Sequence, residues 1–344
     1  MLNFSEFQEY VKRNISEMLP DEYQNAEVGI HTVKKNNGME LCGLTVRAQD
    51  SNIAPNIYLD GFFKEYEEGA DLDLVMGRIC KTVVENINGP EQFATIGRDF
   101  MNFDFVKDKI VMVAINAEKN KELLAGSPHQ LREDLALIYK VMFSTGEEGM
   151  STITIKNEHM KVWGVTTEDI HELAMKNTKE LLPVTIQSMN EIMMEMFSKD
   201  GMPDEIAEAM FEDLPVNQQM FVISNKARVN GAASIFYEEE LAKLANEMGS
   251  DLFILPSSVH ECIAVSTSMG NPEELAELVQ EVNGTQVSED EQLSDHVYRF
   301  DAKARTLSLA DTSMEQLEAK VSEETANYEA TQNQTEGARP HRHR

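Results

Sequence analysis

Short β-branched runs alternate with segments of helical periodicity along the chain, and this alternation constrains the fold more than any other feature. Apolar residues spaced three and four apart predict amphipathic helices, whereas compact or alternating β-branched runs predict strands. Helices are expected over residues 3–18, 57–67, 71–87, 166–182, 187–213 (in two pieces), 237–248 and 272–282. Strands are expected over residues 26–34, 39–48, 110–117, 135–143, 151–155, 221–224, 232–236, 252–255, 259–266, 296–300 and 306–309. The sequence therefore predicts a mixed α/β (α+β) protein.

The expected elements divide the chain into three regions. Residues 1–110 form a helix-rich N-terminal domain with one β-hairpin, because Asn36-Asn37-Gly38 separates two strand-like runs and Asn-Gly is a strong hairpin signal. Residues 111–311 form the main domain, in which a mixed sheet is flanked by helices. Residues 312–344 are polar and are expected to be a disordered tail, since they offer little apolar surface to bury.

The charge balance excludes several kinds of partner. The 344 residues include 60 acidic and 30 basic side chains, which gives a net charge of −30. A phosphate-backbone binder needs a basic face, so we expect no direct binding to nucleic acid. We also expect no docking on anionic membranes and no membrane span, because no apolar stretch is long enough. Glu6 and Glu9 interrupt any signal-peptide core, so the expected location is the cytoplasm.

The familiar cofactor and metal motifs are missing from the sequence. The three cysteines, Cys42, Cys80 and Cys262, are far apart and form no CxxC pair, so we expect reduced thiols and neither a disulfide framework nor a zinc site. No phosphate-binding loop, dinucleotide-binding glycine motif or HExxH helix occurs. The sequence thus predicts neither a cofactor nor a metal site.

The first candidate site is the polar cluster that follows the expected strand 252–255. It contains Ser257, Ser258, His260 and Glu261, which suggests a nucleophile and its base. In an extended segment, Ser258 and His260 share one face and Glu261 points away, so Glu261 could not orient the imidazole. The favoured interpretation is a corner between strands in which hydroxyl groups bond the backbone.

The second candidate is a polar turn at residues 224–231. Its candidate ligand-binding residues are Asn225, Lys226, Arg228 and Asn230. Backbone amides together with Lys226 or Arg228 could bind an anion. The favoured alternative is a hairpin loop that uses the Asn-Gly pair at residues 230–231.

Several longer motifs resemble an uncharacterised domain-of-unknown-function family common in gut Clostridia (Firmicutes). The similar segments are residues 54–59, 157–165, 177–183, 224–233, 248–252, 255–261 and 293–298. The resemblance extends from residue 1 to about residue 310. Residues 150–270 are also similar, more weakly, to another uncharacterised Firmicutes family. The resemblance implies a bacterial cytoplasmic protein and brings no activity with it.

Three functions are compatible with these features. The first is a non-enzymatic interaction or regulatory protein with an unknown protein partner, consistent with the missing motifs and the Met-rich segment 187–213. The second is a hydrolase or transferase that uses Ser257 or Ser258 with His260. The third is an acidic mimic of nucleic acid, which the net charge permits. The oligomeric state stays open.

Overall fold

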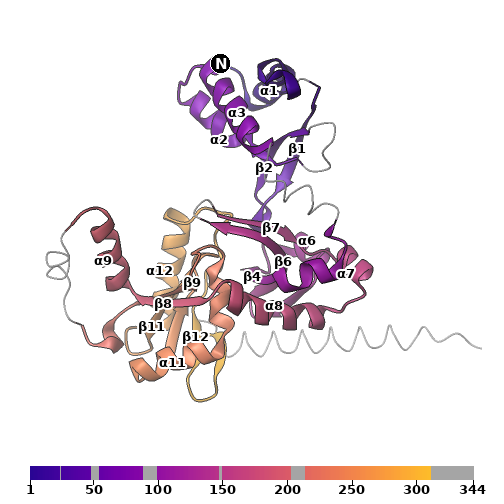
Figure 1. Cartoon of the computed structure of the whole chain (residues 1–344). Coiled ribbons are helices and arrows are strands. Elements are labelled where there is room, and N and C mark those ends of the chain that lie inside the picture. Colours follow the sequence, from indigo (N-terminus) through magenta and orange to yellow (C-terminus); the bar gives the residue numbers. More distant parts are fainter. Residues whose placement is uncertain (24, 48–53, 88–98, 147–148, 203–213, 311–344) are drawn as a thin grey trace, which may run out of the picture.

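The computed structural model describes residues 1–23, 25–47, 54–87, 99–146, 149–202 and 214–310. Its helices and three antiparallel sheets confirm the mixed α+β class. An N-terminal unit stands on a larger body and touches it through the tip of one hairpin (Figure 1). None of the described helices combines the length and the apolar character that crossing a bilayer requires.

The N-terminal unit packs three helices on a small sheet of order β1-β2-β3. Its elements are α1 (Phe4–Met18), β1 (Glu27–Lys34), β2 (Glu40–Arg47), β3 (Ile57–Tyr58), α2 (Leu59–Glu67) and α3 (Leu72–Ile87). Phe7, Val11 and Ile15 are fully buried on one face of α1, as the helical spacing predicts. They belong to a hydrophobic core in which every described residue comes from the N-terminal unit.

The predicted hairpin is confirmed. Strands β1 and β2 pair in antiparallel register, and Lys34 faces Glu40 at the end of the ladder. Asn37 and Gly38 both adopt positive φ angles, 59° and 73°, which asparagine and glycine tolerate best. The local chemistry of these two residues therefore turns the chain and fixes the register of the hairpin.

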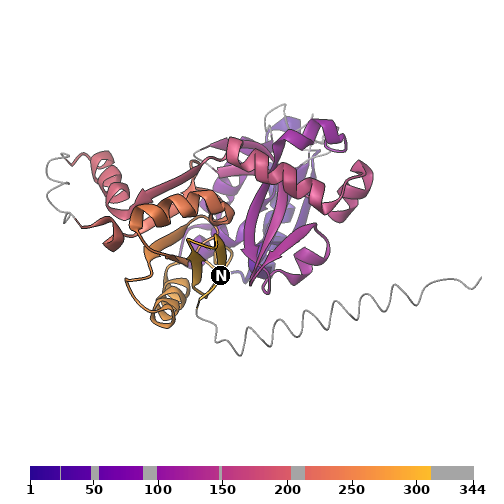
Figure 2. The same ribbon diagram turned by 90° about the horizontal axis from the view of Figure 1, so that it is seen from below.

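The body contains a four-stranded sheet and a six-stranded sheet. The four-stranded sheet comprises β4 (Ile110–Asn116), β5 (His129–Arg132), β6 (Leu135–Gly146) and β7 (Gly149–Thr154), with α5 (Phe103–Val106), α6 (Lys121–Ala125), α7 (Asn157–Trp163) and α8 (Thr167–Leu181) around it. Helix α8 begins with the predicted Thr166 cap, whose side chain accepts a hydrogen bond from the Asp169 N–H. It lies across strands of this sheet (Figure 2).

The six-stranded sheet has the order β13-β12-β10-β11-β9-β8. Its strands are β8 (Val184–Ser188), β9 (Phe221–Asn225), β10 (Leu252–Leu255), β11 (Cys262–Ser266), β12 (Tyr298–Asp301) and β13 (Thr306–Leu309). Its helices are α9 (Met189–Lys199), α11 (Glu238–Met248) and α12 (Pro272–Thr285), and α12 begins at the predicted Asn271 cap. One core joins the inner faces of both sheets, so residues of β4, β6, β9 and β10 pack together.

Two predicted elements are wrong. Residues 232–236, expected as a strand, lie in the 3₁₀ helix η5 (Gly231–Phe236), where the small Ala232 and Ala233 pack deep in the core. Helix was expected from residue 187, but residues 184–188 form β8, which pairs with β9, and helix begins at Met189. In both places tertiary pairing outweighs local propensity.

Parts of the prediction cannot be compared with this structure. The expected tail at residues 312–344 and most of the expected second Met-rich helix lie outside the described residues. The domain boundary near residue 110 stays a prediction, although the N-terminal unit and the body have separate cores.

Candidate functional site

The first candidate cluster forms the corner between β10 and β11, two central strands of the six-stranded sheet. The hydroxyl of Ser258 accepts a hydrogen bond from the backbone N–H of His260 at 3.1 Å. Backbone groups of Pro256, Ser257 and Val259 bond the segment 291–294. Ser258 thus acts on the backbone, as expected for a strand corner.

The imidazole of His260 is held by residues far away in the sequence. Its Nδ1 accepts a hydrogen bond from the backbone N–H of Asn230 at 3.2 Å. Since a backbone N–H can only donate, the neutral ring carries its proton on Nε2, which lies 3.3 Å from a carboxylate oxygen of Glu291. Among the described residues, no hydrogen bond joins this ring to either serine hydroxyl. The imidazole thus bonds the backbone of Asn230, a residue of the second candidate turn.

The second candidate segment meets the first one at this corner. Ser224 donates a hydrogen bond to the backbone oxygen of His260 at 2.7 Å, and the N–H of Gly231 bonds the same oxygen at 3.0 Å. A Cβ atom on Gly231 would lie 2.2 Å from Ser224 Oγ and 2.6 Å from His260 O. The two clusters therefore form one tightly packed corner, with no room for a ligand at Gly231.

The remaining candidate residues of the turn also have local roles. Asn225 is buried and donates to the backbone oxygen of Val229, while its own Oδ1 has no partner within the described structure. Arg228 forms an ion pair with Glu195 of α9 at 3.2 Å. The Lys226 side chain is exposed. Residues 225–231 are not a loop between two strands, because they lead from β9 into η5.

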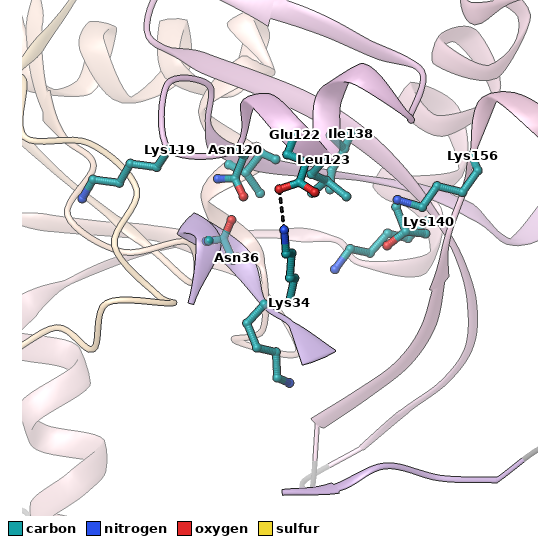
Figure 3. Close-up of a pocket in the computed structure, with 13 residues that line it drawn as sticks. Lys34, Asn36, Lys119, Asn120, Glu122, Leu123, Ile138, Lys140 and Lys156 are labelled. Carbon is teal, nitrogen blue, oxygen red and sulfur yellow. Dashed lines mark hydrogen bonds and ion pairs between the residues drawn. The ribbon is translucent and has the colours of Figure 1, made fainter. Parts of the chain in front are cut away.

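A different site lies where the hairpin meets the outer face of the four-stranded sheet. A pocket of about 450 Å³ opens there (Figure 3). Its lining comprises Lys34, Lys35, Asn36, Gly38, Ile115, Lys119, Asn120, Glu122, Leu123, Ile138, Lys140, Thr154 and Lys156. The described lining thus contains five lysines and one carboxylate, in a chain whose net charge is −30. That excess of positive charge is suited to an anion.

Four of the five ammonium groups have a partner. Lys34 forms an ion pair with Glu122 at 2.6 Å, and this contact raises the pKa of Lys34. Lys119 donates to Gln292 Oε1 and Lys156 donates to Ser127 Oγ. Lys35 lies 4.1 Å from the centre of the Tyr58 ring. Among the lining residues that the structure describes, the only carboxylate, that of Glu122, is therefore already engaged with Lys34.

Lys140 differs from the other four lysines. It lies in the middle of β6, on the same face as Ala136 and Ile138, because side chains alternate along a strand. No hydrogen bond or ion pair to Lys140 occurs within the described part of the chain. Burial lowers the pKa of its ammonium group, and the nearby charge of Lys35 lowers it further.

The tip of the hairpin closes one side of the pocket and is locked to the body by amides. Asn37, which is 8% exposed, exchanges two hydrogen bonds of 2.9 Å with Asn120. Its Nδ2 also donates to the backbone oxygens of Glu289 and Gln292, both at 2.7 Å. The pocket is therefore complete only while the N-terminal unit is seated on the body.

Sequence reasoning missed this pocket because its lysines come from distant segments. One signal was present: Lys140 interrupts the apolar run from Leu135 to Phe143, where a charged side chain is out of place. A lysine inside a buried strand indicates either an ion pair or a functional amine.

The thiols and the metal-binding side chains suggest no second chemical centre. Burial and the nearby charge of Asp60 raise the pKa of Cys42 to about 11, and burial also raises the pKa of Cys80 and Cys262. Protonated thiols are poor nucleophiles. Within the described ranges, no group of three or more His, Cys, Asp or Glu side chains is placed to hold a metal ion.

Comparison with known proteins identifies a family whose function is unknown. The model of the Family of unknown function (DUF5688) matches residues 4–302, and the chain belongs to this family. No curated protein matches the chain. No solved structure matches it either.

Proposed function

We propose that the chain is a non-enzymatic binding protein whose ligand is a small molecule with a phosphate or carboxylate group, held in the lysine pocket. The observation that carries this proposal is the ratio of five ammonium groups to one carboxylate around the cavity. Charge-assisted hydrogen bonds from ammonium groups to such anions are short and strong.

The rest of the chain determines which anions can reach the pocket. A net charge of −30 repels a long polyanion such as nucleic acid, whose many phosphates must approach the whole surface. A small anion needs to approach only the cavity. The pocket therefore favours metabolite-sized ligands.

The seating of the hairpin supports a regulatory role. Lys34, Lys35 and Asn36 come from the N-terminal unit, whereas Lys140 and Lys156 come from the body. An anion between them contacts both parts and stabilises their seated arrangement. We assign the protein to the cytoplasm because its three cysteines are free thiols.

The other two functions have weaker support. A hydrolase or transferase would need a serine hydroxyl bonded to His260, and that imidazole bonds Asn230 and Glu291 instead. The nucleic-acid mimic rests on net charge alone, which is more often a feature of solubility.

Isothermal titration calorimetry with inorganic phosphate, pyrophosphate and citrate at constant ionic strength tests the proposal. We expect at least one of these anions to bind, and a K140M/K156M variant to bind it at least about tenfold more weakly, because two charged contacts are removed. The control K12Q/K303Q changes two exposed lysines outside the pocket and should bind as the parent does. Failure of all three anions to bind, or equal losses in both double variants, would contradict the proposal.

A further inference from the structure

We propose that the amine of Lys140 forms a reversible imine with ligands that carry an aldehyde or ketone beside their anionic group. This inference rests on the proposed function, since the other lysines must first hold the anion. It adds a covalent step and narrows the ligand to an oxo acid or a phosphorylated carbonyl compound.

The geometry distinguishes Lys140 from its neighbours. It lines the cavity at the same end as Lys156, away from Lys119, and the Lys34–Glu122 pair lies between the two ends (Figure 3). In the register of the sheet, Lys140 is opposite Thr154, whose side chain also lines the pocket. Three of the other lysines, Lys34, Lys119 and Lys156, have polar partners of their own. Lys35 lies over the ring of Tyr58, so Lys140 is the amine left to react.

The surroundings of Lys140 favour the nucleophilic form of the amine. Only the neutral amine has the lone pair that attacks a carbonyl carbon, and lysines are activated by desolvation or by a second nearby cation. Both causes act here, because burial and Lys35 lower the pKa of Lys140. Lys34 is affected in the opposite direction, since Glu122 raises its pKa.

The proposed step balances without any further reagent. The nitrogen lone pair of Lys140 attacks the carbonyl carbon and forms a carbinolamine. The former carbonyl oxygen then leaves as water, whose two protons both come from the amine nitrogen, and a neutral C=N bond remains. A proton returns to the imine nitrogen when it becomes an iminium ion. No oxidation or reduction occurs, and water reverses the reaction.

The pocket also indicates how such a ligand would lie. Ile115, Leu123 and Ile138 provide an apolar wall for its carbon skeleton. The ammonium group of Lys156 would hold a phosphate or carboxylate while Lys140 reaches the carbonyl carbon. The chemistry shared by both ligand classes is a carbonyl group and an anionic group on one small molecule.

Borohydride trapping tests the inference with the full chain. The protein is incubated with pyridoxal 5′-phosphate or with pyruvate, reduced, digested and analysed by mass spectrometry. We expect labelling of Lys140 at least about tenfold above that of the exposed Lys12 and Lys303, and competition by pyrophosphate. Pyridoxal, which has the same aldehyde without the phosphate, should label Lys140 far less. K140R, which keeps the charge, should lose the adduct.

The outcomes distinguish imine formation at Lys140 from the proposed binding of an anion in the lysine pocket. Labelling spread evenly over the surface lysines, or concentrated on another pocket lysine, overturns the imine at Lys140. If pyrophosphate still binds in calorimetry, the anion site stands without the covalent step. If inorganic phosphate, pyrophosphate and citrate all fail to bind as well, both proposals fail. Competition by pyrophosphate is measured on the parent protein, so the result does not depend on the folding of a variant.

Discussion

The corner at His260 and the lysine pocket are both polar, but their polar groups are used differently. At the corner, Ser224, Ser258 and the imidazole of His260 all bond backbone groups. In the pocket, ammonium groups outnumber carboxylates by five to one, and Lys140 has no partner in the described structure. Polar groups that bond the backbone stabilise the fold, whereas an ammonium group without a partner is available to a ligand.

This difference explains why a dense polar motif can mislead. Residues 256–261 attract attention because serine, histidine and glutamate are adjacent in the sequence. Adjacent residues in a turn mostly satisfy their own backbone. The pocket gathers residues from several separate segments, which is how most binding sites are built, and only tertiary structure brings them together.

The largest expected loss of stability comes from a substitution that disrupts the packing of the corner at His260. Gly231→Ala should lower the free energy of unfolding by about 3 kcal/mol, because its Cβ would overlap Ser224 Oγ and backbone atoms of Asn225 and His260. Chemical denaturation measures the change. The control is Gly77→Ala, which lies in the exposed part of α3 with nothing near its Cβ and should stabilise the helix by about 0.5–1 kcal/mol. Equal stabilities for both variants would mean that the corner is not tightly packed.

A smaller loss is expected when single hydrogen bonds of the corner are removed. Ser258→Ala and His260→Ala should each lower the free energy of unfolding by about 1–2 kcal/mol, because a backbone N–H loses its acceptor. Thermal denaturation compares them with Glu261→Ala, an exposed change expected to have almost no effect. Neither variant should alter the affinity for an anion. If Ser258→Ala and His260→Ala were both as stable as the parent, this cluster would have a functional and not a structural role.

The smallest expected change in the free energy of unfolding comes from a substitution in the pocket, and it is an increase. Lys140→Met should raise the free energy of unfolding by about 1 kcal/mol at neutral pH, because it replaces a half-buried unpaired cation with an apolar side chain of similar size. It should weaken anion binding at the same time. A destabilised variant would indicate a partner for Lys140 that offsets its burial.

The pH dependence of this effect follows from the direction of the pKa shift. The pKa of Lys140 is lower in the folded chain than in the unfolded chain, so folding releases a proton between the two values. The parent protein therefore gains stability relative to Lys140→Met as the pH rises toward about 10, the range of an ordinary lysine. Denaturation at several pH values should show that the difference in free energy of unfolding between Lys140→Met and the parent becomes smaller as the pH rises. A difference that grows with pH would contradict the lowered pKa of Lys140.

Local signals in the sequence predicted most of the fold. Asn37 and Gly38 specified the hairpin, and Thr166 and Asn271 marked helix starts, because each acts within a few residues. The strand β8 and the helix η5 were predicted wrongly because their conformations depend on partners far away in the chain. β8 pairs with β9, and the N–H groups of Gly231 and Ala232 bond the corner.

The pocket was beyond sequence reasoning for a similar reason. Lys34 and Lys156 approach each other only because the hairpin tip is seated against Asn120 and the segment 289–292. The charged Lys140 within an apolar strand was the one local sign. Such an exception to the apolar pattern is more informative than a dense polar turn, because burying a charge has a cost that function can explain.

Lysine footprinting tests most directly whether the pocket, and not the corner or the general surface, binds the anion. The rate of acetylation of each lysine is measured by mass spectrometry with and without pyrophosphate. The account predicts that Lys34, Lys35, Lys119, Lys140 and Lys156 are protected, while the exposed Lys12, Lys226 and Lys303 are unchanged. Unchanged rates at all five pocket lysines, or the same protection at every lysine, would contradict it.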